Sequence, residues 1–251
     1  MNITYFLEQK LKLIEYFFSV ATAPFGETLR KIEQNVEPYV VRSNPEYAAG
    51  PAFQEEWDLA DAAFQLAGAS SLDYLQSTLH SFMFMYMEAT GNLDVAKNIK
   101  LFKKGSWYAN YQECFKQCFN IDWAASEANL ELIEHLILTR NDFAHGSHLL
   151  TLYAFQDQKH AEKHPGAAFV DARWRNSKLM GTKLAVSRES LFEAIEQVRK
   201  LCGYLEAQRT PHLGQFKLSN RIAAKTLQKL AQRIQKKPQQ DQNLTKSSDV
   251  E

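Results

Sequence analysis

The sequence predicts an all-α protein, a helical bundle, on three observations. Residues 3–20 and 187–205 carry apolar side chains at intervals of three and four, the spacing of one helix face. Residues 54–89 are nearly free of glycine and proline and are rich in alanine, leucine, phenylalanine and methionine. Segments that alternate as strands do are short and fall within residues 149–186, so we expect a minor β-hairpin insertion there.

The first ninety residues predict two helices separated by an irregular connection. Residues 3–20 form a helix packed against a core through Phe6, Leu7, Leu11, Leu13, Ile14, Phe17 and Phe18. Residues 21–52 contain four prolines and two glycines and indicate mainly a connection, although residues 27–36 could form a short helix. Within the second helix, the run 82–87 is apolar all round; it could line a binding groove, but a buried core or dimer-interface helix is the simpler interpretation.

Two pairs of potential metal ligands occur in the middle of the chain. Cys114 and Cys118 lie four apart on a predicted helix over residues 107–119, but no second Cys/His pair is present nearby at zinc spacing, which favours buried thiols. His160 and His164 are also four apart, in a polar segment that proline 165 interrupts, and we interpret that segment as a solvated loop. We therefore predict no metal site and no cofactor.

Composition narrows the class of protein. The 251 residues are 45% apolar and 12% aromatic, which is ample for a buried core. Three cysteines are too few, and odd in number, for a disulfide framework, so we expect a reducing cytoplasm. Charged residues at positions 8, 10, 12 and 15 interrupt the first apolar stretch, which excludes a signal peptide or a membrane span.

The C-terminal region predicts a basic amphipathic helix. Residues 215–237 hold seven Lys or Arg and no acid, although the whole chain has zero formal net charge. Every fourth position is basic, at Lys217, Arg221, Lys225, Lys229 and Arg233. The row is either a solvated face or a footprint for the phosphate backbone of nucleic acid. We expect a helical domain over residues 1–210 with its core in 54–207, then this helix, then a disordered tail over 238–251.

The helix predicted over residues 130–145 carries an arginine in its apolar stripe. Ile133, Ile137 and Ala144 recur at helical spacing, and Arg140 completes the pattern. A guanidinium cannot lose its charge on burial, so Arg140 needs a carboxylate partner, a subunit interface or a bound phosphate. Asp122 or Ser126 could cap this helix, and Gly146 is the expected stop after His145.

Arg140 and His145 together suit cleavage of an RNA phosphodiester. An imidazole titrates near neutrality and can move the proton of a 2′-hydroxyl or of the leaving oxygen. A guanidinium can neutralise the charge that builds on the phosphorane-like transition state. Asn141 could position a phosphate oxygen or the histidine tautomer.

The segment 140–146, Arg-Asn-Asp-Phe-Ala-His-Gly, closely resembles the R-x4–6-H motif of the HEPN superfamily, in which a polar residue typically comes directly after the arginine. Residues 183–191 also resemble the segment downstream of this motif in many bacterial members. The resemblance covers residues 54–207 loosely and 140–146 specifically. It implies a HEPN-type helical bundle and a homodimer that brings two motifs into one cleft. It also implies metal-independent RNA cleavage leaving a 2′,3′-cyclic phosphate, with Arg140 and His145 catalytic and Asn141 supporting.

The resemblance further implies a bacterial toxin or phage-defence effector, whose partners are RNA and an antitoxin or defence-system protein. In members paired with a nucleotidyltransferase antitoxin, a tyrosine two residues after the histidine is modified. That position here is Ser147, so we do not expect this mode of neutralisation.

Two other interpretations remain open. The chain could be a HEPN-like module without nuclease activity that binds a nucleotide or a protein, with Arg140 paired structurally to Glu131, Glu134 or Asp142. It could also be a helical scaffold whose basic helix binds nucleic acid or a partner helix. Geometry constrains the nuclease interpretation, because five residues of a straight helix turn by about 140° beyond one full turn. Arg140 and His145 can share a site only if the helix breaks near His145 or if two chains face each other.

Overall fold

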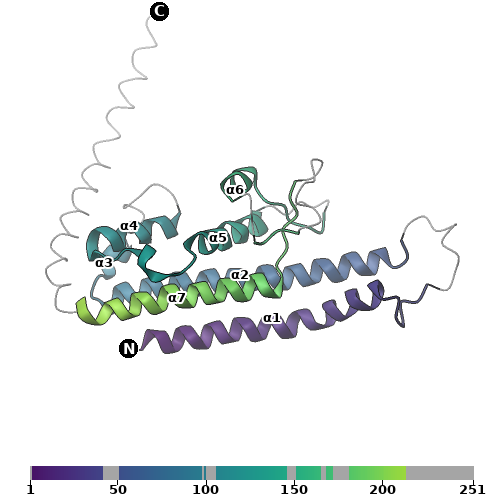
Figure 1. Cartoon of the computed structure of the whole chain (residues 1–251), viewed down its shortest axis with the longest axis horizontal. Helices are drawn as coiled ribbons and strands as arrows, with labels where there is room; N and C mark the ends of the chain where they lie inside the picture. The colour runs from purple at the N-terminus through teal and green to yellow at the C-terminus, as the bar shows by residue number, and fades with distance from the viewer. Residues whose placement is uncertain are drawn as a thin grey trace, which may run out of the picture. The chain divides into compact units, whose positions relative to one another are not determined.

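The computed structural model describes residues 2–41, 51–97, 99, 106–145, 151–164, 168–171 and 181–212, and these residues are mostly helical. The helices are α1 (Ile3–Glu33), α2 (Gln54–Ala89), α3 (Leu93–Lys97), α4 (Trp107–Phe119), the 3-10 helix η3 (Trp123–Ser126), α5 (Leu130–His145), α6 (Gln158–Lys163) and α7 (Arg188–His212) (Figure 1). The all-α prediction is confirmed at this level. In the described ranges, β pairing is limited to isolated antiparallel bridges, Phe155 with Lys183 and Val170 with Leu184, so a regular hairpin is not formed by those residues.

The chain divides into two compact units, which we describe separately. Residues 5–79 and 129–199 form one, which we call the motif unit because it contains Arg140 and His145. Among the described residues, those within 80–128, together with 2–4 and 200–212, form the other. We call this second one the aromatic unit.

The core of the aromatic unit is built from rings. Tyr86 of α2 lies with its ring centroid 5.2 Å from that of Phe115 of α4, and Phe115 lies 5.5 Å from Trp123 of η3. All three side chains are fully buried, and burial raises the pKa of the Tyr86 hydroxyl above its usual range. The apolar run 82–87 therefore contributes to a core, as predicted. Cys114 is a buried thiol, also as predicted, whereas the side chain of Cys118 lies outside the described part.

α1 extends past its predicted end at residue 20 to Glu33 and runs through Pro24. A proline inside a helix removes one N–H donor, and here the orphaned acceptor is the Val20 carbonyl. Pro24 is exposed, so water can solvate that carbonyl and the helix need not end. The predicted connection over residues 21–52 therefore begins later than expected, and of the short helix predicted over 27–36 only residues 27–33 are helical, as the last part of α1.

α1 and α2 run antiparallel within the motif unit. Three side-chain pairs set the register: Lys10 with Tyr74, Phe18 with Phe64, and Glu33 with Trp57. α7 packs on the same side of α1, where the Phe18 and Phe192 ring centroids lie 6.4 Å apart. Arg199 of α7 also pairs with Glu8 of α1 at 3.0 Å, so an apolar core and an ion pair both hold these helices together.

The segment that carries the β bridges is fixed to α2 by a buried charge cluster. The Lys183 ammonium lies 2.6 Å from Asp61 of α2 and 3.9 Å from Asp171, and all three side chains are buried. The same ammonium lies 3.5 Å from the centroid of the Tyr153 ring. A buried ion pair needs such additional partners because its desolvation is costly. This cluster therefore places residues 181–186 directly against α2.

Gly68 allows that segment to approach α2 closely. A Cβ atom added to Gly68 would lie 2.6 Å from the Val186 Cβ, nearer than real side chains come. The Val186 N–H also donates to the Gln65 side-chain oxygen at 2.7 Å, so the backbone at Val186 cannot simply move away.

We predict that Gly68→Ala destabilises the protein by about 1–3 kcal/mol, because overpacking outweighs the helix propensity that alanine adds. Urea unfolding followed by far-UV circular dichroism measures the change. Gly203→Ala is the matched control, since its Cβ meets no atom within 4 Å; this variant should gain about 0.5–1 kcal/mol. The double variant Gly68→Ala/Val186→Ala should recover part of the loss, and a Gly68→Ala protein as stable as wild type would contradict the close packing.

Candidate functional site

α5 carries the motif and begins at a cap that the sequence interpretation missed. The Asn129 side-chain oxygen accepts the Leu132 N–H at 2.9 Å, and Gln197 of α7 accepts the Asn129 N–H at 2.7 Å. Neither predicted cap lies at the start of α5. Asp122 caps η3 by accepting the Ala124 N–H, and Ser126 is the last residue of η3. The error arose because η3 inserts an extra short turn between α4 and α5.

The buried face of α5 is only partly the predicted stripe. Ile133 and Ile137 are buried as expected, and Leu136 and Thr139 join them. Ala144, the third residue of the predicted stripe, is exposed. Arg140 therefore lies at the border of the buried face rather than in the middle of a continuous apolar stripe.

Arg140 pairs with Asp73 of α2. Its Nε atom donates to the Asp73 Oδ1 atom at 2.6 Å, and its Nη2 atom is also 2.6 Å from that oxygen. Its Nη1 atom donates to the side-chain oxygen of the neighbouring Asn141 at 3.3 Å. The sequence allowed Arg140 a carboxylate partner, a subunit interface or a bound phosphate. The structure provides a carboxylate, which comes from α2 and not from Glu131, Glu134 or Asp142.

The Arg140–Asp73 pair remains open to solvent. The two side chains expose 32% and 49% of their surface, respectively. An ion pair this exposed contributes little to stability, typically below about 1 kcal/mol. The pair therefore orients the guanidinium at the surface, where a dissolved anion can still reach it.

His145 is exposed and is the last residue of α5, which stays helical from Leu130 to His145. Along such a helix Arg140 and His145 are about 7.5 Å apart in rise and about 140° apart in direction. The helix thus does not break before His145, and one chain does not point both side chains at one atom. Gly146 and Ser147 lie outside the described residues.

A buried histidine cluster lies beside the motif, and the sequence interpretation missed it. His160 and His164, expected in a solvated loop, are only 4% and 6% exposed. Residues 158–163 form α6, capped by the Asp157 side chain, which accepts the Lys159 N–H. The His135 ring of α5 lies 4.8 Å from the His160 ring and 5.5 Å from the His164 ring, measured between centroids. The four-residue spacing was the available signal, since a helix places both histidines on one face.

Three acidic residues of α5, Glu131, Glu134 and Asp142, contact the histidines of this cluster. Asp142 Oδ2 lies 2.5 Å from His160 Nδ1 in a buried contact, and it also accepts the Asp157 N–H at 3.2 Å. Glu131 and Glu134 lie 3.4 Å and 3.6 Å from the two ring nitrogens of His164. These contacts join the beginning and the end of α5 to α6 and to His164 directly after it, so they fix the orientation of the helix that carries the motif.

His135 is held in its neutral form. Desolvation, with the neighbouring His160 and His164 rings acting in the same direction, lowers its pKa to about 3. Its Nδ1 atom accepts the Ala168 N–H at 3.3 Å, so the ring proton resides on Nε2. That tautomer has no lone pair on Nε2 for a metal ion. In the part of the chain that the structure describes, no group of three or more His, Cys, Asp or Glu side chains is arranged to hold one.

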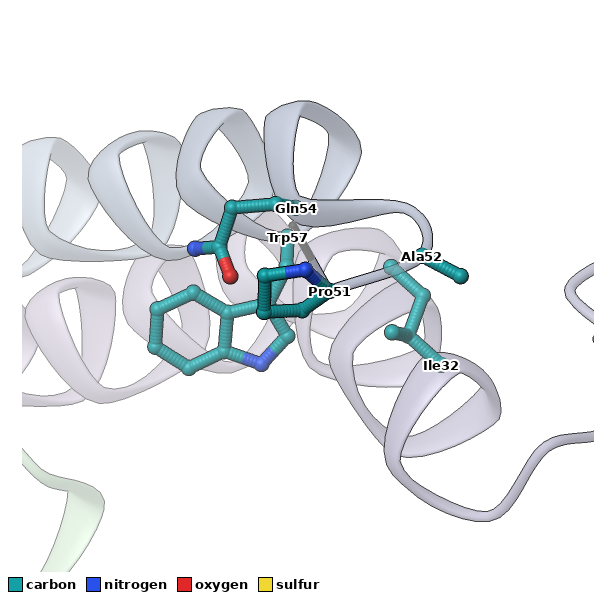
Figure 2. A pocket seen from close by; sticks show the side chains of 5 residues that line it. All are labelled: Ile32, Pro51, Ala52, Gln54 and Trp57. Carbon is teal, nitrogen blue, oxygen red and sulfur yellow. The ribbon is translucent and has the colours of Figure 1, made fainter. Parts of the chain in front are cut away.

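A shallow pocket lies elsewhere on the motif unit. Figure 2 shows its lining by Ile32, Pro51, Ala52, Gln54 and Trp57, around a volume of about 250 Å³. Trp57 is sixteen residues before Asp73 on α2, about 24 Å along the helix axis. The pocket is therefore separate from Arg140, and its lining residues include no charged side chain and no histidine.

The predicted nucleic-acid-binding residues cannot be placed. Lys217, Arg221, Lys225, Lys229 and Arg233 all lie outside the described residues, as does the whole tail from 238 to 251. Their role stays a prediction from the sequence.

We predict that stability falls as the pH decreases from about 6.5 toward 3, with His135 as one cause. In this window the unfolded chain binds a proton at residue 135 that the folded chain does not, so acid favours unfolding. Urea midpoints measured at pH 7.5 and pH 5 should differ less for His135→Phe than for wild type. His145→Phe, at an exposed position, should keep the wild-type difference. Equal pH dependence of His135→Phe and wild type would contradict the assignment.

No helix among the described residues combines the length and the apolar character needed to cross a bilayer. Comparison of the chain with models of known protein families, with curated proteins and with solved structures found no match. Function must therefore be argued from the residues of the site.

Proposed function

We propose that the protein is a HEPN-type, metal-independent endoribonuclease in which Arg140 and His145 act on an RNA phosphodiester. The observation that carries this proposal is the accessibility of both groups at one end of α5. The Arg140 guanidinium is a third exposed and already oriented by Asp73, and His145 is exposed at the helix terminus. Together with the resemblance of residues 140–146 to the R-x4–6-H motif, this arrangement suits recognition of an anionic, solvent-borne substrate.

The reaction needs no metal. The His145 imidazole takes the proton of the ribose 2′-hydroxyl, or returns one to the departing 5′-oxygen. The 2′-oxygen bonds to phosphorus as the bond from phosphorus to the 5′-oxygen breaks, which leaves a 2′,3′-cyclic phosphate and a 5′-hydroxyl. Arg140 stabilises the charge on the non-bridging oxygens in the transition state. Asn141, which accepts a hydrogen bond from Arg140 Nη1, would hold the guanidinium in its orientation.

The site would be composite, formed by two copies of the chain. Because α5 is continuous, its Arg140 and His145 diverge, and one phosphate could receive both groups most readily from facing helices. The basic row from Lys217 to Arg233 would add contacts to the RNA backbone. The expected setting is a cytoplasmic toxin or phage-defence effector, controlled by an antitoxin or defence-system protein.

A non-catalytic HEPN-like module that binds a nucleotide or a protein is the second candidate. The Arg140–Asp73 ion pair favours it, because docking α5 on α2 would by itself account for the presence of the arginine. The two candidates differ in what happens when Asp73 is neutralised. A structural arginine loses its role, whereas a catalytic arginine keeps its charge near the substrate.

We predict that Arg140→Ala and His145→Ala each reduce RNA cleavage by at least about 100-fold, the scale of losing a transition-state donor or a general acid–base. Purified protein is incubated with a labelled RNA in EDTA, and products are tested for a 2′,3′-cyclic phosphate end. Asp73→Asn should retain most of the cleavage. Unfolding midpoints of the variants should stay near wild type, because both side chains are exposed or partly exposed.

Matched substitutions sharpen this test. Arg188→Ala and His80→Ala remove the same residue types away from the motif and should cleave as wild type does. Wild-type cleavage by both Arg140→Ala and His145→Ala would refute the nuclease. Absence of cleavage in wild type, together with destabilisation by Asp73→Asn, would favour the non-catalytic module.

A further inference from the structure

α1 carries a stripe of exposed apolar side chains on the side away from its core. Its buried residues in the motif unit include Leu7, Leu11, Ile14 and Phe18. The exposed ones are Tyr5, Phe6, Leu13, Tyr16, Phe17 and Val20, each with 44% to 68% of its surface in solvent. At 100° per residue, these six positions fall within an arc of about 120°. We call this set the α1 stripe.

Four residues of the α1 stripe, Phe6, Leu13, Tyr16 and Val20, occupy positions of a coiled-coil seam. Positions 6, 9, 13, 16, 20 and 23 alternate in steps of three and four, and all of them are exposed. In heptad terms the a positions hold Phe6, Leu13 and Val20, and the d positions hold Gln9, Tyr16 and Ala23. The same register continues to Glu27, where the Glu27–Arg30 ion pair ends the apolar run. Four of the six seam positions therefore hold large apolar or aromatic side chains, the pattern of a helix face that packs against a partner helix.

The α1 stripe has the area of a protein interface. Large apolar and aromatic side chains each bury about 150–250 Å² in a core, so six side chains that are about half exposed present about 500–600 Å². Tyr74 of α2 borders the stripe, since its hydroxyl lies 3.3 Å from Lys10 Nζ, and it adds to this surface. The total is at the upper limit of what monomers expose and approaches the roughly 800 Å² that each partner contributes to a standard interface.

We infer that the α1 stripe binds the α1 stripe of a second copy of this chain, with the two helices antiparallel. In that orientation a two-fold axis between residues 13 and 16 pairs each a position with a d position of the other copy. The seam then pairs Phe6 with Ala23, Gln9 with Val20 and Leu13 with Tyr16 of the other copy. At each end of the seam the large Phe6 ring therefore meets the small Ala23 side chain. Lys10 and Lys12 come opposite Ser19 and Phe17, so like charges do not meet.

This inference does not rest on ribonuclease activity. It follows from the exposure and spacing of residues on α1, none of which belongs to the motif. A chain without any cleavage would dimerise in the same way, so failure of the nuclease proposal would leave this inference standing.

The test is the oligomeric state of the full-length protein, measured by sedimentation equilibrium. Wild type should be a dimer at micromolar concentration, and Leu13→Glu/Tyr16→Glu should raise the dissociation constant at least about 100-fold, since central interface residues dominate binding. Circular dichroism should be unchanged, because both side chains face solvent in the single chain. Leu152→Glu is the matched control: Leu152 is 59% exposed but outside the stripe, and its variant should remain dimeric.

Cysteine cross-linking tests the orientation. A mixture of Phe6→Cys chains and Ala23→Cys chains should form a disulfide-linked dimer on oxidation, whereas Phe6→Cys alone and wild type should not. A wild-type monomer at all concentrations would overturn the inference, whether or not it bound lipid vesicles or another protein through the same stripe. A dimer that survives Leu13→Glu/Tyr16→Glu would overturn it as well, and self-linking of Phe6→Cys would overturn the antiparallel arrangement.

Discussion

The permanent charge of Arg140 is the constraint around which the motif unit is arranged. A guanidinium at the edge of a buried helix face needs a compensating negative charge, and the Asp73 carboxylate of α2 supplies one at 2.6 Å. This contact sets where the last two turns of α5 lie on α2, while Ile133 and Ile137 bury the first two. Because the pair stays partly exposed, it adds orientation more than stability. The same geometry that satisfies the charge leaves the guanidinium within reach of a dissolved phosphate.

Helical geometry explains why Asp73 and not a neighbouring acid pairs with Arg140. At 100° per residue, Glu131, Glu134 and Asp142 point about 120° to 180° away from Arg140 around α5. They face α6 instead, where they meet His160, His164 and Lys163. These angles follow from the sequence alone, so the sequence already excludes the three acids as partners of Arg140. Asp73 could not have been chosen, because its proximity depends on the packing of α5 against α2 across 67 residues of sequence.

For α1 the sequence pattern predicted the helix but not which of its two apolar faces is buried. The three-and-four spacing correctly predicted a helix, but residues 3–20 contain two apolar stripes with that spacing. The core uses Leu7, Leu11, Ile14 and Phe18, whereas Phe6, Leu13 and Phe17, predicted to lie in the same core, are exposed. Periodicity cannot say which stripe has a partner within the chain. The solvated loop predicted for His160 and His164 was wrong for a related reason. Their polarity suggested exposure to solvent, but His135 and the acidic residues of α5 provide a buried polar environment for both rings.

The α1 stripe and the motif are close neighbours on α2. Tyr74 borders the stripe through Lys10, and Asp73, the preceding residue of the chain, holds Arg140. Successive residues of a helix differ in direction by about 100°, so the two side chains diverge onto adjoining faces. A second copy bound along the α1 stripe would therefore meet the face of α2 that carries Tyr74, not the face that carries Asp73. Dimerisation through α1 thus leaves Arg140 accessible to a substrate.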